Sequence, residues 1–538
     1  MNMRNKFYLL AAMLATASIS WSQSVFDAYS LSQQELRGTA RFMSMAGAFG
    51  ALGGDMSVLN QNPGGIGIYR SSDIGLTLDG TFRNSKVTTN AGIDKMNEND
   101  FNFNNIGYIG VYRTNSSGLK NFNWGFSYNK KADFRRTYSG AIDGISTSLT
   151  NFVAGQTNAT KFTKDDLGAI KDKYNPYLDS NAPWMSILAY NSYLINPTNG
   201  DRDFVGLMGE NSKGYNSFLV DESGQIDEYT ISFGGNALNV LYWGASIGIE
   251  DVNFSQYTYY EETVNNAVVP GNADGSILLN GTANWSLENS LNLYGTGVNF
   301  KLGVILKPIN ELRIGLAFHT PTRYSMTSEY VAGTNYNLNA SNGNIIRGDA
   351  YTDEGYVNVT DFTVRTPWKV IGSLAGVLGG RAILSVDFEH TAYQNMKVLF
   401  GGREDLSITD AINAYYKPME TIRVGGEVRV TPKFSVRAGY SYSTSPFSDE
   451  IRNNQLNVMT SGTTLAYTID KNNQYVTAGF GFRAGAFYAD FAYIYNQRNS
   501  EYYAFSPDIP DRGKPIYSPS ADVKDTNHEI VATLGFRF

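Results

Sequence analysis

The C-terminal segment Asn527–Phe538 alternates between apolar and mostly polar side chains, and this pattern constrains the fold more than any other feature. From residue 530 onwards, the even-numbered residues are all apolar: Ile530, Ala532, Leu534, Phe536 and Phe538. Because successive side chains of a β-strand point to opposite faces, the segment predicts a strand with one apolar and one largely polar face. Repetition of this pattern along most of a chain that ends on an aromatic residue is typical of transmembrane β-barrels.

The same alternation recurs in several other segments: 122–128, 298–306, 421–430, 434–443 and 476–483. The mean hydropathy is −0.28, and no long uninterrupted apolar run occurs after the N-terminal segment. Helical membrane spans, which need about 20 consecutive apolar residues, are therefore excluded. A barrel lacks such a run because only every second residue of a strand faces lipid.

The N-terminus has the pattern of an export signal. Two basic residues, Arg4 and Lys6, precede an apolar stretch over 7–19, and Ser22 supplies a small residue at the −1 position of a cleavage site. The apolar stretch is short for a membrane span and typical of a signal peptide. We expect residues 1–22 to be a signal peptide; an anchor on the membrane surface is the alternative.

Residues 23–70 lack the strand alternation and carry helix and turn signals instead. Thr39 is a candidate N-cap for a helix of small residues, and the run Asn62-Pro63-Gly64-Gly65 favours a turn directly before the first strand. A barrel of about fourteen strands has a lumen that needs filling. The sequence therefore predicts an N-terminal hatch (plug) in the lumen over 23–70, followed by an antiparallel transmembrane β-barrel over 71–538.

We expect fourteen strands, joined alternately by tight turns and long loops. The tight turns are at 115–120, 236–239, 308–311, 377–381, 431–433 and 484–485, and the long loops at 84–104, 131–225, 261–285, 331–356, 399–418, 445–473 and 505–526. Short periplasmic turns and long extracellular loops are the layout of outer-membrane barrels. The longest loop, 131–225, lacks alternation and carries short helical patterns, so we expect a partly helical extracellular loop there.

The glycine-rich segment Met45–Asp55, followed by Asn62-Pro63, resembles the N-terminal hatch of the FadL/TodX family of outer-membrane transport proteins. The family's Asn-Pro-Ala motif falls on Asn62 and Pro63, but Gly64 stands at its third position. The resemblance implies a monomeric barrel in the outer membrane of a Gram-negative bacterium, where it takes up long-chain fatty acids or similar lipophilic compounds. It also implies contact with outer-membrane lipid and lipopolysaccharide, and insertion by the barrel-assembly machinery.

The resemblance assigns roles to two places in the chain. Asn62, Pro63, Gly64 and Gly65 would form the hinge of a gating hatch, although the same residues also make a simple turn into the first strand. Family members release ligand sideways where the third strand bends inward, and Gly125 lies in the middle of the third predicted strand. A glycine within a strand tolerates such a bend, but it equally makes room for a plug.

Within 131–225, a group of apolar residues has two alternative interpretations. They either capture a hydrophobic ligand in a surface groove or pack the core of an extracellular cap: Phe162, Leu167, Trp184, Met185, Leu188 and Tyr190. The inward faces of the predicted strands carry charges of both signs, which we expect to form ion pairs that hold the plug.

The composition argues against other function classes. The chain has no cysteine, so it has neither disulfides nor thiolate metal sites. Its net charge of −7 argues against nucleic-acid binding. The three histidines, His319, His390 and His528, are scattered, and no catalytic or phosphate-binding motif occurs. We therefore expect no enzyme activity, no cofactor and no metal.

The sequence thus favours a passive transporter that captures hydrophobic molecules on extracellular loops, binds them in the lumen and releases them under control of the hatch. The alternative is an outer-membrane barrel that acts as a secretion shuttle or as an interaction protein. An apolar tunnel through the lumen would favour transport, whereas a tightly packed lumen would favour the shuttle.

Overall fold

The computed structural model describes residues 25–168, 174–198, 203–270, 278–460, 462–508 and 517–538. The predicted signal peptide, 1–22, lies outside these residues. The chain forms a closed antiparallel β-barrel of fourteen strands, as the sequence predicted. The barrel closes where β1 (Asp73–Thr88) pairs with β22 (Ser520–Arg537).

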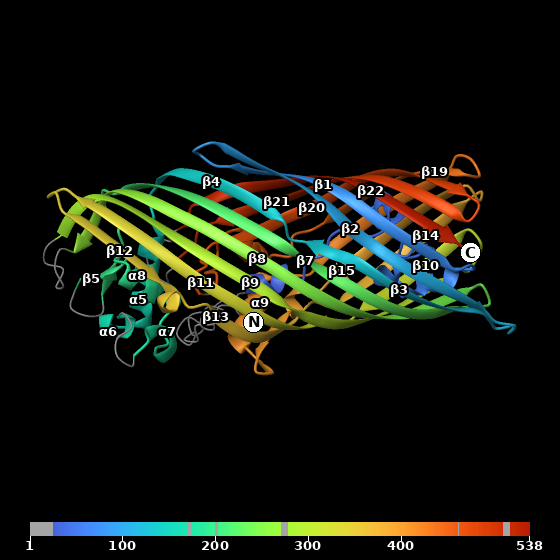
Figure 1. Ribbon diagram of the computed structural model, residues 1–538, viewed down its shortest axis with the longest axis horizontal. Helices are drawn as coiled ribbons and strands as arrows, with labels where there is room; N and C mark the ends of the chain where they lie inside the picture. The colour runs from blue at the N-terminus through green and yellow to red at the C-terminus, as the bar shows by residue number, and fades with distance from the viewer. Residues whose placement is uncertain (1–24, 169–173, 199–202, 271–277, 461, 509–516) are drawn as a thin grey trace.

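The remaining barrel strands follow one another in chain order around the wall (Figure 1). Four of the fourteen positions consist of two consecutive strands separated by irregular backbone: β3 with β4, β10 with β11, β13 with β14, and β15 with β16. Their bounds are β2 (Ile93–Arg113), β3 (Leu119–Asp133), β4 (Arg136–Ile145), β7 (Lys213–Ala237), β8 (Leu241–Pro270), β9 (Leu278–Leu306), β10 (Leu312–His319), β11 (Arg323–Ala340), β13 (Asn358–Arg365), β14 (Lys369–Leu378), β15 (Ala382–Thr391), β16 (Lys397–Phe400), β18 (Met419–Arg429), β19 (Phe434–Ser443), β20 (Tyr467–Ala484) and β21 (Phe487–Tyr503).

The two faces of the last strand are those that its alternation predicts. Ile530 and Phe536 are about half exposed on the outer surface of the barrel, whereas Val531 and Thr533 are buried on the inner surface. Phe538 at the chain end pairs with Ser72 through two backbone hydrogen bonds of 3.0 Å. The terminal residue is therefore part of the closure of the barrel.

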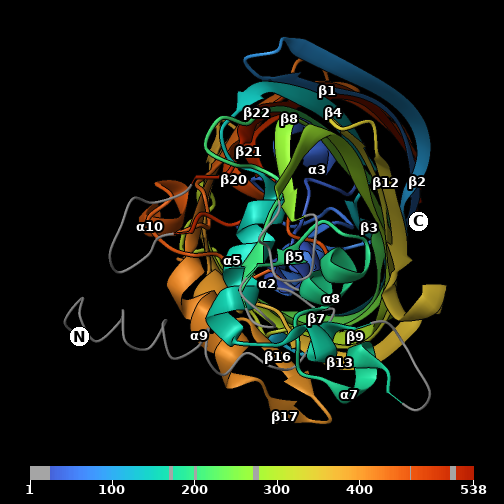
Figure 2. The ribbon, with the colours of Figure 1, turned by 90° about the vertical axis from the view of Figure 1, so that its left-hand side faces the viewer.

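The N-terminal segment lies inside the barrel (Figure 2). It contains α2 (Val25–Ser30), α3 (Ala40–Ser44), α4 (Val58–Gln61) and the 3-10 helix η1 (Pro63–Ile68). The Thr39 hydroxyl accepts a hydrogen bond from the Phe42 N–H, so Thr39 is the N-cap that the sequence predicts for α3. We refer to residues 25–72 as the hatch segment.

Short helices lie toward the end of the barrel opposite the C-terminus (Figure 1). They are α5 (Leu149–Thr160), α6 (Lys164–Leu167), α7 (Pro176–Asp179), α8 (Trp184–Asn191), α9 (Leu406–Tyr415), α10 (Asp449–Arg452), η2 (Thr352–Gly355) and η3 (Tyr393–Asn395). Four further strands lie there: β5 (Asn196–Pro197), β6 (Phe204–Val205), β12 (Ile345–Tyr351) and β17 (Arg403–Glu404). Among the described residues, no helix has the length and apolarity to cross a membrane.

Several predicted loops are strand over much of their length, so the predicted boundaries were wrong there. Residues 84–104, 261–285 and 331–356 contain the outer ends of long hairpins, and 131–225 includes β4 and part of β7. These parts rise beyond the lipid, where the outer face of a sheet is free to be polar. Backbone pairing holds such hairpins together, and the apolar alternation that marks a membrane strand is absent.

We expect the helices α5–α8 to be extracellular and the tight turns to be periplasmic. An epitope inserted after Lys161 should bind antibody on intact cells, because this residue ends α5 in the cap. An epitope inserted at Leu238, in the turn between β7 and β8, should bind antibody only after permeabilisation. The opposite labelling pattern would contradict this orientation.

Candidate functional site

The base of the hatch segment is fixed by Asn62. Its side-chain N–H groups donate to the Gly50 carbonyl at 2.6 Å and to the Val304 carbonyl of β9 at 3.3 Å, and its Oδ1 accepts from Gly64 N–H at 3.0 Å. Pro63 occupies the first turn of η1, where a missing N–H costs nothing. Asn62, Pro63, Gly64 and Gly65 are all buried. They therefore anchor the segment to the wall as well as turning the chain into β1.

Two glycines in this anchor are required by close approach of backbones. A Cβ on Gly64 would lie 2.9 Å from the Gly303 carbonyl oxygen and from Val304 Cα of β9. A Cβ on Gly303 would in turn collide with the Asn62 side chain. The family's alanine at the third motif position therefore has no room here, and Gly64 lets the hatch seat directly on the wall.

Buried ion pairs hold the upper part of the hatch segment. Arg37 lies 3.3 Å from Asp79 of β1 and 3.6 Å from Glu529 of β22, and Arg41 lies 2.9 Å from Glu427 of β18. Removing one partner of such a buried pair costs about 3–5 kcal/mol, because the other charge is left uncompensated. The expected salt bridges between the lumen and the plug are present in these pairs.

Two cavities remain in the lumen beside the hatch segment, with volumes of about 210 and 160 Å³. We call them the outer and the inner cavity. Gln34 and Glu35 of the hatch segment and Tyr393 and Met419 of the wall line both of them, so the cavities meet at these residues. The lumen is therefore plugged, but it is not tightly packed.

The two cavities differ in chemistry. The outer cavity has many aromatic side chains, together with the ion pairs Arg498–Asp470 and Arg136–Asp525, each at 2.8 Å. Its aromatic lining includes Phe26, Tyr29, Phe134, Tyr138, Phe254 and Tyr502. The inner cavity has fewer aromatic side chains and is lined by the ion pairs Lys131–Glu250 at 2.7 Å and Arg423–Glu389 at 3.0 Å.

The wall is intact at Gly125, where the sequence placed a lateral opening. Gly125 of β3 pairs with Ile109 of β2 on one side and with Ser232 of β7 on the other, and the register is continuous around it. A Cβ at this position would lie 3.2 Å from Leu59 of the hatch segment. The expectation of a gap at Gly125 is wrong for this structure, because this glycine makes room for the plug.

The ladder between β2 and β3 instead ends higher up, at the pair Asn105–Asn129. Two β-bulges flank this point: Asn104 is the extra residue of β2 against β1, and Lys131 is the extra residue of β3 against β7. Bulges disrupt a ladder and bend the strand that carries them. Among the described residues, no backbone pairing joins 93–104 of β2 to 130–145 of β3 and β4. We call this region the β2–β3 gap.

Beyond the gap, β4 lies against β2, β1 and β22 without forming backbone pairs with them. Side chains span the gap in place of backbone pairs: Lys130 Nζ donates to Asn102 Oδ1 at 2.6 Å, and Arg135 forms an ion pair with Asp100. The adjacent polar residues Lys130 and Lys131 interrupt the alternation of β3. The sequence signal for this site is therefore the pair of adjacent lysines, and not a glycine within a strand.

The hatch segment connects the two bulges that flank the gap. The Glu35 N–H donates to the Lys131 carbonyl at 3.2 Å, and the Gly38 N–H donates to Asn104 Oδ1 at 3.3 Å. Asn104 also approaches Met43 Sδ at 3.4 Å through its side-chain nitrogen. We call residues Glu35–Gly38 the hatch bridge. It joins the edges of the wall where their own ladder is missing.

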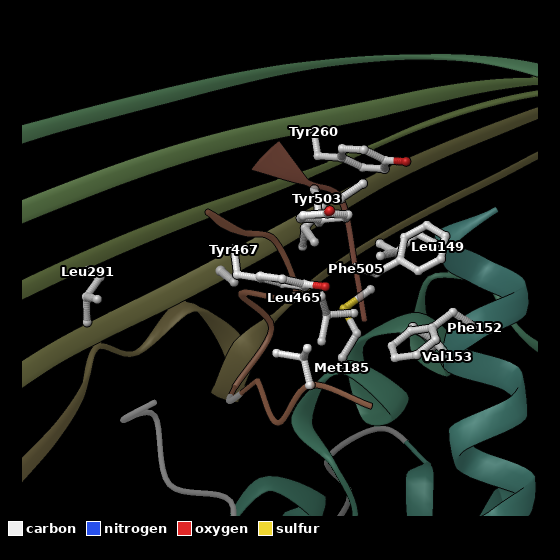
Figure 3. Packing of buried hydrophobic residues seen from close by; sticks show 14 of the residues in the cluster. Leu149, Phe152, Val153, Met185, Tyr260, Leu291, Leu465, Tyr467, Tyr503 and Phe505 are labelled. Atoms are coloured by element: carbon white, nitrogen blue, oxygen red, sulfur yellow. The ribbon is translucent and has the colours of Figure 1, made fainter. Parts of the chain in front are cut away.

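The six residues proposed from sequence as ligand-capturing lie in the core of the cap that contains α5–α8. Leu167, Trp184, Met185 and Leu188 are buried, while Phe162 and Tyr190 pack against the same core. Figure 3 shows Met185 among side chains from α5 and from the segments 465–467 and 503–505. These residues therefore pack the cap, and they form no groove on its outer surface.

A closed β-barrel with an apolar outer band, an internal hatch and residual lumen cavities defines the class of plugged outer-membrane barrels. The crystal structure of a Pseudomonas aeruginosa FadL homologue is similar, with 13% identity, coverage of 94% of this chain and 99% of that chain, and a TM-score of 0.50. The P. putida toluene transporter TodX has 14% identity, the same coverages and a TM-score of 0.46. A comparison with curated proteins finds no match.

The model of the family "Outer membrane protein transport protein (OMPP1/FadL/TodX)" matches residues 244–489. Over these residues the chain is similar to the FadL/TodX family of outer-membrane transport proteins, in agreement with the resemblance of its hatch segment. The matched family is one of outer-membrane transport proteins.

We expect Gly303→Ala to loosen the base of the hatch, because the new Cβ collides with the Asn62 side chain. In planar bilayers the variant should conduct ions severalfold better than the parent protein. Gly372→Ala is the matched control, since a Cβ there meets nothing within 4 Å. Equal conductance of the two variants, with both barrels folded, would contradict the assignment of Asn62 and Gly303 as the anchor of the plug.

Proposed function

We propose that this protein passively imports hydrophobic small molecules, such as long-chain fatty acids or similar lipophilic compounds, and releases them sideways through the β2–β3 gap. The observation that carries the proposal is the hatch bridge, because one segment of the plug holds both edges of the gap. In this proposal, movement of the hatch segment and opening of the β2–β3 gap are coupled.

The position of the outer cavity supports this route. Residues 132–136, which bend from β3 into β4, line the outer cavity and also border the gap. A molecule in this cavity is thus separated from the outer membrane by the side chains that span the gap. The mixed aromatic and charged lining favours a ligand that has an apolar body and a polar group.

The strength of the hatch bridge suits a gate. It contains two hydrogen bonds to the wall, each worth about 0.5–1.5 kcal/mol net. A ligand that displaces Glu35 from the junction of the two cavities frees the Lys131 bulge. The loss of the second bond at Asn104 then leaves the gap closed only by side chains.

The alternative function is a secretion shuttle or an interaction protein of the outer membrane. The two lumen cavities favour transport over the shuttle, because a shuttle needs no room beside its plug. We also propose that the protein works as a monomer and that the barrel-assembly machinery inserts it. Aromatic residues at the last and third-last positions, Phe538 and Phe536, support the latter.

We expect cells that carry the protein to take up labelled dodecanoate, dodecane or toluene faster than cells that lack it. The reason is that the saccharide of the outer leaflet slows apolar solutes, whereas the cavities offer a path through it. Initial uptake rates measured with all three compounds also identify the preferred class. Equal rates in both strains for every compound would refute the transport proposal.

A disulfide across the gap should abolish release. Asp100→Cys together with Arg135→Cys replaces the ion pair that spans the gap, and the chain has no native cysteine to interfere. The control is Lys86→Cys with Lys95→Cys, which joins partners already paired in the β1–β2 ladder. We expect the first disulfide to reduce uptake to the level of cells without the protein, with recovery after reduction. Unchanged uptake in the locked and folded variant would exclude this gap as the exit.

A further inference from the structure

A second interruption of the wall lies on the extracellular side of β15 and β18. The ladder between these strands ends at the pair Thr391–Met419. Three pairs below it, Phe388 faces Ile422, and both side chains are exposed on the lipid-facing surface. The two pairs between them are polar: Glu389 faces Thr421, and His390 is hydrogen-bonded to Glu420 at 2.8 Å. The ladder therefore ends just above the apolar band, at the level of the membrane interface.

Above this point a helix takes the place of strand pairing. The chain runs from η3 through β16 and β17 into α9, and β16 pairs with β13 but not with β18 among the described residues. Figure 2 shows α9 at the rim of the barrel, outside the ring of strands. Its inward side chains are buried: Ile408, Ala411, Ile412 and Tyr415. Its first residue, Leu406, is 69% exposed.

The helix covers the place where the two lumen cavities meet. α9 contacts η3 and α2, and these elements contribute Tyr393 and Tyr29, respectively, to the lining of the outer cavity. Met419, at the end of the interrupted ladder, lines both cavities. The side chains under the helix are largely aromatic, with Tyr416 stacked on Tyr29 at 5.5 Å and packed on Phe447 at 4.9 Å. A displaced α9 would open an aromatic path to the junction of the cavities.

The attachment of α9 is uneven. Its C-terminal end is tied to the segment that follows β19. The Ser448 N–H donates to the Tyr415 carbonyl and the Lys417 N–H to the Pro446 carbonyl, each at 2.7 Å. Near its N-terminal end, the Glu404 carboxylate accepts from Lys397 at 2.8 Å and from the Thr409 hydroxyl at 3.0 Å. The hydrogen bond from Lys397 lowers the pKa of Glu404, so this carboxylate is ionised at neutral pH.

The attachment near the N-terminal end is the weaker of the two, because it has one backbone hydrogen bond, from the Asp405 N–H to the Val398 carbonyl of β16 at 3.0 Å, against two at the C-terminal end. Lys397 and Glu404 are partly exposed, and exposed ion pairs contribute only about 0–1 kcal/mol. The turn before the helix contains Gly401 and Gly402, both with positive φ and with open space around a Cβ. This turn is free to change its backbone angles without a clash.

From these observations we infer that α9 is a lid over an entrance for apolar ligands that arrive along the outer membrane interface. The lid opens at the Lys397–Glu404–Thr409 contact and stays attached at Tyr415–Lys417. The entrance leads directly to the junction of the cavities, beside the hatch bridge. This inference rests on the proposed function as far as the direction of ligand movement is concerned, but the opening of the lid is measurable without transport.

Cross-linking tests the entrance. Lys397→Cys with Thr409→Cys, joined by a short reducible bis-methanethiosulfonate, locks the lid at its weak attachment. The control pair, Lys417→Cys with Asp449→Cys, ties the end that is already fixed. With labelled dodecanoate and dodecane as probes, we expect the lock to reduce uptake to that of cells without the protein, with recovery after reduction. Equal uptake in the locked and control variants would contradict the assignment of an entrance under α9. Absence of uptake in the parent protein would refute the proposed function instead.

A second measurement tests the lid itself. Ala411 lies on the buried side of α9 and Asn413 on its exposed side. A cysteine at each position is treated separately with a membrane-impermeant maleimide on folded protein, as judged by heat-modifiable gel mobility. We expect Asn413→Cys to react at once and Ala411→Cys to react completely but more slowly, at the rate at which the lid opens. Complete protection of Ala411→Cys while Asn413→Cys is fully labelled would overturn the lid, whatever the transport assay shows.

Discussion

The pairing of β1 with β22 closes the sheet, and the rest of the structure depends on it. Within lipid, every backbone N–H and C=O must find a partner in the protein, so a sheet can span the membrane only without free edges. Closure with fourteen strands leaves a lumen that side chains of the wall alone do not fill. The hatch segment is the consequence, and its ion pairs with the wall follow from the polar inner face that the barrel requires.

Among the described residues, two interruptions of the ladder lie on the proposed route, and each has a substitute of a different kind. At the β2–β3 gap the substitutes are side-chain contacts together with the hatch bridge, and above β15 and β18 the substitute is α9. Separating side-chain contacts or a packed helix from the wall requires less free energy than opening a continuous ladder, because fewer hydrogen bonds break together. The interruption above β15 and β18 begins near the upper edge of the lipid-facing band, where water satisfies the backbone groups that an opening exposes.

The sequence predicted the membrane strands well and the extracellular ones poorly. In lipid, the outer face of a strand is apolar and its inner face polar, so alternation in segments such as Val298–Leu306 is strong. Beyond the lipid, the outer face of β2 and β8 contacts water, and the alternation that reveals a strand is lost. In the cap, the apolar side chains of Trp184 and Leu188 predicted one apolar face of a helix. They did not predict whether that face packs inward or is exposed.

By itself, the sequence determined the barrel, its strand number, the hatch and the residues Asn62–Gly65 at its base, because each depends on local patterns of residues near in the chain. Only the tertiary structure decided where the wall is interrupted. Glu35, Gly38, Asn104 and Lys131 are far apart in sequence, and their contacts arise from bulges in two different strands. Gly125 suggested a bend in the third strand but lies in an unbroken ladder, because a glycine permits a bend without requiring one. Leu59 of the hatch segment packs into the space that the missing side chain leaves.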